Sequence, residues 1–295
     1  MTAHARRPAD RRRLGAVLGL SVGVLVVEVA GGLLANSLAL LADAAHVFTD
    51  IVGVGLAIGA MWIAERPSSA ERTFGFLRLE ILAAVLNAVL LFGIAVIVLV
   101  EAWQRLSEPP EVRSGLMLGV ALVGLAANGI AVAVVHGASR RSLNVRGAYL
   151  EVLGDFAGSI AVLVAAAVVA LTGTRAADPI ASAVIAVLIV PRTWGLLREA
   201  VDVLLEATPR GVDMAHVRAH ILDAPGVDDV HDLHAWTITS GMNVVSAHVV
   251  LADGADAAAA LDELARCLAD DFDIEHSTFQ LEAADRRRLE EAAHP

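Results

Sequence analysis

Six long apolar segments constrain the fold of this 295-residue chain more than any other feature. They occupy roughly residues 14–35, 38–64, 79–101, 114–136, 148–172 and 179–203. Each segment is long enough to cross a bilayer, because a transmembrane helix needs about 20 apolar residues. The mean hydropathy of +0.66 also favours an integral membrane protein over a soluble enzyme. The first segment is too long for an ordinary signal peptide, so we expect it to be a transmembrane helix.

The placement of arginine predicts how the six helices are oriented in the membrane. The N-terminus and the loops 65–78 and 137–147 hold 11 arginines, whereas the loops on the opposite side hold 3. Because positive residues stay on the cytoplasmic side, both termini are expected in the cytoplasm. We therefore predict a basic cytoplasmic N-terminus (residues 1–13) and a transmembrane domain (residues 14–204).

The last third of the chain has the pattern of a small cytoplasmic domain over residues 205–283, followed by a charged tail over residues 284–295. Helical spacing and strand alternation predict the order αββαβ, a small α+β sandwich with helices on one face of a sheet. An open sheet edge favours self-association. Residues 205–295 hold 6 Arg against 18 Asp and Glu, and this acidity argues against a nucleic-acid partner.

Polar side chains inside the apolar segments point to function, because an ionised group near the bilayer centre costs roughly 2.5–3.5 kcal/mol. His46 and Asp50 lie four residues apart, and so do Glu151 and Asp155. Each pair therefore projects from one face of its helix. Two facing pairs would supply one imidazole and three carboxylates, which suit a tetrahedral divalent cation. A purely structural hydrogen-bonding role explains one such pair more readily than two matched pairs.

Other polar residues in the same segments are expected to support such a site rather than to bind the ion. Asp43 is a candidate for a supporting hydrogen bond to the ligands, and an interfacial position is the alternative. Asn128 is a candidate for the same supporting role, and Glu28 and Asn87 are expected to be packing or supporting groups. The single cysteine, Cys267, excludes an intrachain disulfide and a cysteine-rich metal site.

Several stretches together resemble the cation diffusion facilitator family. They are NSLALLADAAHVFTD, TFGFLRLEILAAVLNAVLL, SLNVRGAYLEVLGDFAGS, ADPIAS, VHDLHAWTITSG, SAHVV and FDIEHSTFQLE, and they follow the family order across nearly the whole chain. The resemblance implies six transmembrane helices and a cytoplasmic domain of the ferredoxin-like, metallochaperone-like kind. It also implies a homodimer that exports a divalent metal in exchange for protons. The family's transport site maps onto His46, Asp50, Glu151 and Asp155.

Glu151 departs from the pattern of the zinc-selective members, which commonly have histidine at this position. Zinc accepts carboxylate oxygens, so Zn²⁺ stays the first expectation for the transported and regulatory ion. A hard carboxylate ligand also makes Mn²⁺, Fe²⁺ or Co²⁺ more competitive, and Cd²⁺ is a further alternative substrate.

The resemblance also implies a second metal site in the cytoplasmic domain. The family's positions there fall on His231, His248, Glu275 and Glu282. Adjacent strand residues point to opposite faces, so only one of Glu275 and His276 can face such a site. The alternative is that these are exposed polar residues of a soluble domain with no metal.

The expected transport mechanism follows from the ligand chemistry. Metal binding needs neutral imidazole and ionised carboxylates, so metal and protons compete for the same groups. His46 is the natural proton carrier because its ordinary pKa lies near ~6.5. An enzyme is not expected, since no HExxH, GxSxG or phosphate-binding glycine motif is present. A proton-coupled exporter of organic cations and a metal sensor that does not transport remain as alternatives.

Overall fold

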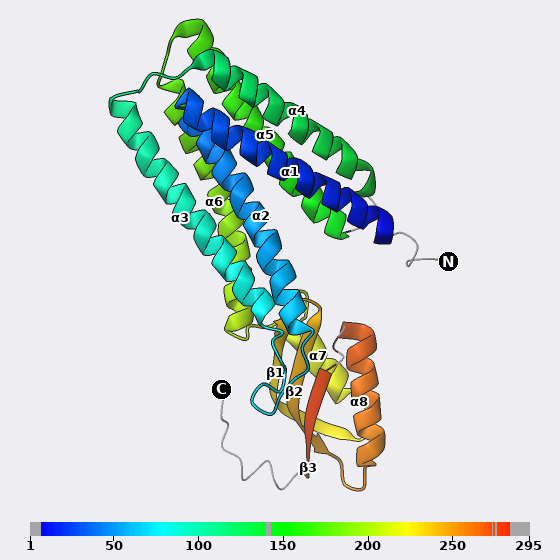
Figure 1. Ribbon diagram of the computed structural model, residues 1–295. Helices are drawn as coiled ribbons and strands as arrows, with labels where there is room; N and C mark the ends of the chain where they lie inside the picture. Colours follow the sequence, from blue (N-terminus) through cyan, green and yellow to red (C-terminus); the bar gives the residue numbers. More distant parts are fainter. Residues whose placement is uncertain (1–6, 140–142, 273, 275, 284–295) are drawn as a thin grey trace. The chain divides into compact units, whose positions relative to one another are not determined.

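The computed structural model describes residues 7–139, 143–272, 274 and 276–283. The chain forms two compact units (Figure 1). The first comprises residues 1–59 and 83–197, and the second comprises residues 60–82 and 198–295.

Six long helices contain the six apolar segments (Figure 1). Their bounds are α1 (Arg7–Ala35), α2 (Leu38–Ala64), α3 (Leu79–Ser107), α4 (Ser114–Ser139), α5 (Leu143–Thr172) and α6 (Ala177–Leu204). The prediction of six membrane-spanning helices is confirmed. Several helices run past the apolar segments; in α3 the final turns are polar, and Arg105 pairs there with Glu101 one turn back at 2.8 Å.

Large apolar side chains cover the outside of the helix bundle, while small ones fill its inside. Ile97 and Leu171 are more than half exposed, as expected for side chains that face lipid. Alanines from α2, α4, α5 and α6 meet in the main core, where Ala39 and Ala166 are fully buried. Small residues let helix backbones approach closely, and van der Waals packing then replaces the hydrophobic driving force that lipid removes. This close approach brings polar side chains of different helices together.

A buried carboxylate joins the start of α2 to the start of α6. Asp178 on α6 is fully buried and accepts hydrogen bonds from the Ser37 hydroxyl at 2.5 Å and from the backbone N–H of Leu38 at 2.8 Å and of Ala39 at 3.2 Å. The first N–H groups of a helix have no intrahelical acceptor and carry partial positive charge. Asp178 therefore caps α2 from a neighbouring helix and fixes where α2 begins.

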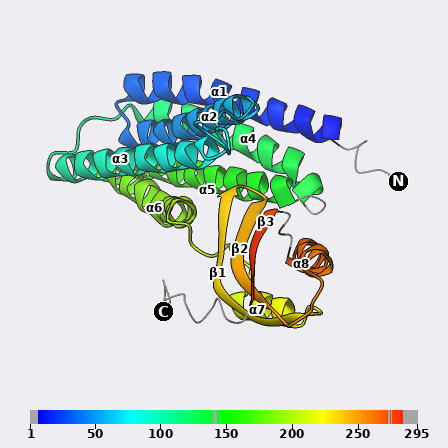
Figure 2. The ribbon, with the colours of Figure 1, turned by 90° about the horizontal axis from the view of Figure 1, so that it is seen from below.

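The αβ domain of the second unit consists of α7 (Met214–Leu222), β1 (Val227–Thr239), β2 (Met242–Leu251), α8 (Ala257–Phe272) and β3 (His276–Ala283). The sheet order is β1-β2-β3, with β2 antiparallel to β1 and parallel to β3. Both helices lie on one face of the sheet (Figure 2), and Val217, Val249 and Leu264 are fully buried between the two layers. The predicted order αββαβ is confirmed.

Residues 60–82, the end of α2 and the start of α3 with their connection, pack in the second unit. Glu80 accepts hydrogen bonds from the hydroxyls of Thr239 and Ser240 at the turn between β1 and β2. Arg78 pairs with Glu206 at 2.8 Å. The rings of Phe74 and His276 meet edge to face, with centroids 5.7 Å apart. Hydrogen bonds, an ion pair and a ring contact therefore tie residues 60–82 to the αβ domain.

Replacing the capping carboxylate should destabilise the helix bundle. Asp178→Ala leaves three buried donors without their acceptor, and we expect it to lower the free energy of unfolding by about 2–3 kcal/mol. The measurement is thermal unfolding of the detergent-solubilised protein, with the exposed Asp253→Ala as the matched control. Equal unfolding temperatures for the two variants would contradict the capping role.

Candidate metal centres

Three of the four residues predicted for the membrane site lie together inside the bundle. His46 and Asp50 project from the same face of α2, and Asp155 reaches them from α5. The Nε2 atom of His46 lies 3.6 Å from Oδ2 of Asp50 and 3.4 Å from Oδ1 of Asp155. One ligand atom from each residue lies within 4.8 Å of the other two.

These separations suit a metal ion better than they suit an ion pair alone. Tetrahedral Zn²⁺ with bonds of about 2.0–2.1 Å places its ligand atoms roughly 3.3–3.4 Å apart. The two His46 distances lie at or just above that spacing. In addition, Oδ1 of Asp155 is buried and receives no hydrogen bond from the part of the chain that the structure describes. Its contact with Nε2 of His46 at 3.4 Å is long for a hydrogen bond, and a cation would satisfy this buried anionic oxygen better.

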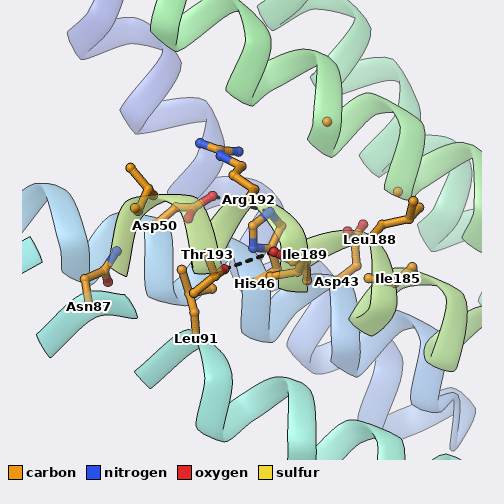
Figure 3. A pocket seen from close by; sticks show the side chains of 13 residues that line it. Asp43, His46, Asp50, Asn87, Leu91, Ile185, Leu188, Ile189, Arg192 and Thr193 are labelled. Carbon is orange, nitrogen blue, oxygen red and sulfur yellow. Dashed lines mark hydrogen bonds and ion pairs between the residues drawn. The ribbon is translucent and has the colours of Figure 1, made fainter. Parts of the chain in front are cut away.

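A cavity of about 120 Å³ adjoins the three ligands, and side chains of α2, α3 and α6 converge on it (Figure 3). Its polar lining includes Asp43, His46 and Asp50 of α2 together with Asn87 of α3 and Thr193 of α6. The volume gives room for a metal ion with a few water molecules. Sites for drug-sized organic molecules span about 300–1,000 Å³. The cavity therefore fits a small hydrated cation.

The remaining residues predicted for the membrane site have different positions. The side chain of Glu151 lies outside the described residues. Asp43 is buried and lines the cavity, but it is not one of the three clustered ligands. Asn128 on α4 donates a hydrogen bond to the Ser159 hydroxyl at 2.9 Å and so holds α4 against α5. Asp43 therefore lies beside the ligands, whereas Asn128 contacts Ser159.

Arg192 lines the same cavity, and the sequence-based reasoning missed it. It follows Pro191 in the middle of α6, directly after the apolar stretch of residues 183–190. The rule that flags carboxylates inside a membrane span applies equally to a guanidinium, so the signal was present. A guanidinium here adds one positive charge to a cavity that Asp43 and Asp50 also line.

A second cluster lies in the αβ domain, where three of the predicted residues meet. His231 on β1 pairs directly with His248 on β2, and their ring centroids are 5.0 Å apart. A ring nitrogen of His231 lies 3.2 Å, and one of His248 lies 3.0 Å, from the carboxylate of Glu282 on β3. Two imidazoles and one carboxylate form a donor set that zinc accepts.

The surroundings of Glu282 favour its ionised form. Its side chain is fully buried, which alone would raise its pKa. A hydrogen bond of 2.6 Å from the Gln280 amide and the nearby rings of His231 and His248 outweigh that effect, so the pKa of Glu282 is lowered from its ordinary value of 4.5. The αβ cluster is therefore held together by its own hydrogen bonds.

The other residues considered for this site lie elsewhere. Glu275 lies outside the described residues. His276 is exposed and contacts Phe74 instead of the cluster. An irregularity in the strand pairing between His231 and His234, with Asp232 at a positive φ of 47°, breaks the simple alternation of faces along β1.

Comparisons with known proteins agree with this architecture. Residues 15–205 match the family described as "Cation efflux transmembrane domain". Residues 209–284 match the family described as "Cation efflux protein, cytoplasmic domain". Together the two matches cover nearly the whole chain.

Relatives are also similar to this chain over nearly its full length. The "Metal cation efflux system protein CzcD" of Cupriavidus metallidurans is 43% identical over 99% of this chain and 93% of its own. The "Zinc transporter ZitB" of Escherichia coli is 38% identical over 95% of this chain and 90% of its own. The solved metal-bound C-terminal domain of the CzcD transporter from Cupriavidus metallidurans is 46% identical, covers 24% of this chain and 99% of its own, and has a TM-score of 0.23.

The lowered pKa of Glu282 predicts a pH-dependent contribution to stability. A group whose pKa is depressed by folding stabilises the fold above its unfolded pKa, and this contribution is lost as the pH falls through the folded pKa. Glu282→Gln should therefore lower the free energy of unfolding by roughly 1–3 kcal/mol at pH 7. The gap from wild type should shrink below pH 4.5.

Thermal unfolding between pH 7 and pH 4 in metal-free buffer measures this gap. The exposed Asp262→Asn on α8 is the matched control and should track the wild type throughout. A gap for Glu282→Gln that stays constant across the range would contradict the electrostatic origin.

Proposed function

Because the chain belongs to the cation diffusion facilitator family and is a divalent metal cation efflux transporter, we propose that it exports Zn²⁺ in exchange for protons. The observation that carries the proposal is the convergence of His46, Asp50 and Asp155 beside a small polar cavity inside the bundle. Glu151, one turn before Asp155 on α5, is the proposed fourth ligand.

The exchange follows from the chemistry of the ligands. Metal binding requires neutral His46 and ionised Asp50 and Asp155, whereas protons bind the same atoms. When the cavity opens toward the side with fewer protons, metal binds and protons leave. When it opens toward the more acidic side, protons return to the ligands and metal is released. A rearrangement of the helices that alternates access then couples the two flows.

Zinc is the preferred substrate in this proposal, and cobalt or cadmium is the runner-up. A relative from Bacillus velezensis, named "Cadmium, cobalt and zinc/H(+)-K(+) antiporter", is 39% identical over 89% of this chain. The mixed nitrogen and oxygen ligand set is compatible with all three ions. The cavity volume of about 120 Å³ argues against organic cations as substrates.

We further propose that the protein lies in the bacterial inner membrane with both termini in the cytoplasm, and that it works as a homodimer. The excess of arginine in the N-terminus and in two loops supports this orientation. The sheet of the αβ domain has β1 and β3 at its edges, which leaves strand edges for contact with a second copy. His231, His248 and Glu282 would hold a regulatory zinc ion there.

Loss of one membrane ligand should abolish transport. Asp50→Ala removes one of the clustered carboxylates, and metal-dependent proton flux in proteoliposomes should fall to the level of empty vesicles. Glu101→Gln on α3 is the matched control, because it removes a carboxylate outside the cluster, and it should keep wild-type flux. Wild-type flux in Asp50→Ala would contradict the assignment.

Exchanging the unusual ligand should change the metal preference. Glu151→His replaces a hard oxygen by a nitrogen, so flux should shift toward Zn²⁺ and away from Mn²⁺ by roughly tenfold in their ratio. The measurement is a panel of Zn²⁺, Cd²⁺, Co²⁺, Mn²⁺ and Fe²⁺ in the same flux assay, with Glu101→Gln as the control. An unchanged metal profile would show that Glu151 is not a ligand.

A further inference from the structure

Two carboxyl side chains meet inside the bundle next to the metal ligands, although neither belongs to the cluster. Glu28 of α1 is 1% exposed and Asp43 of α2 is 2% exposed. The two side chains lie within hydrogen-bonding distance of each other. Two ionised carboxylates at this distance in a bilayer interior would repel strongly, so something must compensate.

Few hydrogen-bond donors among the described residues reach the carboxyl oxygens of Glu28 and Asp43. The Asn128 amide donates to the Ser159 hydroxyl, and the Ser159 hydroxyl is hydrogen-bonded to Asp43. Because Ser159 accepts from Asn128, its single hydrogen is free to be donated to Asp43. Oε2 of Glu28 has no donor among the described residues. The contact between Glu28 and Asp43 can be a hydrogen bond only if one of the two carboxyls carries a proton.

The surroundings of Glu28 and Asp43 leave little space between the two carboxyls for any cation larger than a proton. A Cβ added at Gly124 of α4 would lie 2.6 Å from Oε1 of Glu28, and one added at Gly158 of α5 would lie 3.0 Å from Oδ1 of Asp43. The carboxyls therefore rest against helix backbone. Among the described residues, the charged or titratable groups that act on the pair are His46 on α2 and Asp155 on α5, while α4 contributes the neutral Asn128.

We propose that Glu28 and Asp43 form a proton-binding site, with the proton on Glu28, that empties when a metal ion enters the adjoining cavity. Asp43 lines that cavity, so the charge of a bound divalent cation acts directly on the pair and favours its ionised form. The O–H bond of Glu28 then breaks, and the proton leaves to water. This inference rests on the proposed function, and it assigns one exchanged proton to groups that do not bind the metal.

Counting the protons released on zinc binding tests the proposal. Isothermal titration calorimetry of the full chain in detergent, in buffers of different ionisation enthalpy, gives protons released per Zn²⁺. Glu28→Gln, which imitates the protonated acid, should release about one proton fewer than wild type at neutral pH, and Glu101→Gln should match the wild type. Equal release from Glu28→Gln and wild type would overturn the proposal.

A second measurement on the wild type does not depend on any variant. Infrared difference spectra should show the carbonyl stretch of a protonated carboxyl disappear when Zn²⁺ is added, and its persistence would overturn the proposal. If binding instead requires K⁺ and Glu28→Gln removes that requirement, the pair holds a monovalent cation and the proposal is wrong. Failure of the proposed function is distinct, because wild-type protein would then neither bind Zn²⁺ nor transport it.

Discussion

The cost of placing charge in a bilayer controls the inner part of this protein. Ionised groups there persist only when protons, partners or cations balance them. His46, Asp50 and Asp155 satisfy this constraint by gathering around a position that a divalent cation can occupy. The pair of Glu28 and Asp43 satisfies it by sharing a proton. The same constraint links the two sets, because a cation entering the cavity changes the balance for both.

The packing of the bundle makes these arrangements possible. Fully buried alanines at the centre of the bundle let the helices approach until polar side chains from different helices meet. Gly124 and Gly158 allow Glu28 and Asp43 to rest against helix backbone. Asp178 fixes the start of α2 two turns before His46, so the capping interaction and the position of the ligands on α2 belong to one continuous helix. Stability and ligand geometry are therefore set by the same contacts.

Much of the fold could be predicted from the sequence. Each of the six apolar runs specifies one helix, and the αββαβ pattern specifies the five elements of the αβ domain. The pairing of His46 with Asp50 also followed from the helical period, since residues four apart share a face. The partner of Asp43 could not be predicted in this way. It depends on how α1 and α2 are rotated against each other, and no local pattern records that rotation. The cap that Asp178 forms on α2 could not be predicted for the same reason, because it depends on how α6 packs against α2. Arg192 could have been predicted, because an ionised residue inside a membrane span is visible in the sequence.

The two candidate metal centres use similar donors but differ in what holds them together without a metal. In the αβ domain, Glu282 accepts a hydrogen bond from Gln280 and lies against two imidazoles, so its charge is already satisfied. A metal ion bound there must replace contacts that already stabilise the fold. In the bundle, a buried oxygen of Asp155 has no hydrogen bond from the described residues. The charge of that centre is balanced only when an ion or a proton binds, and reversible binding suits transport. The αβ centre is stable without a metal, which suits a regulatory site.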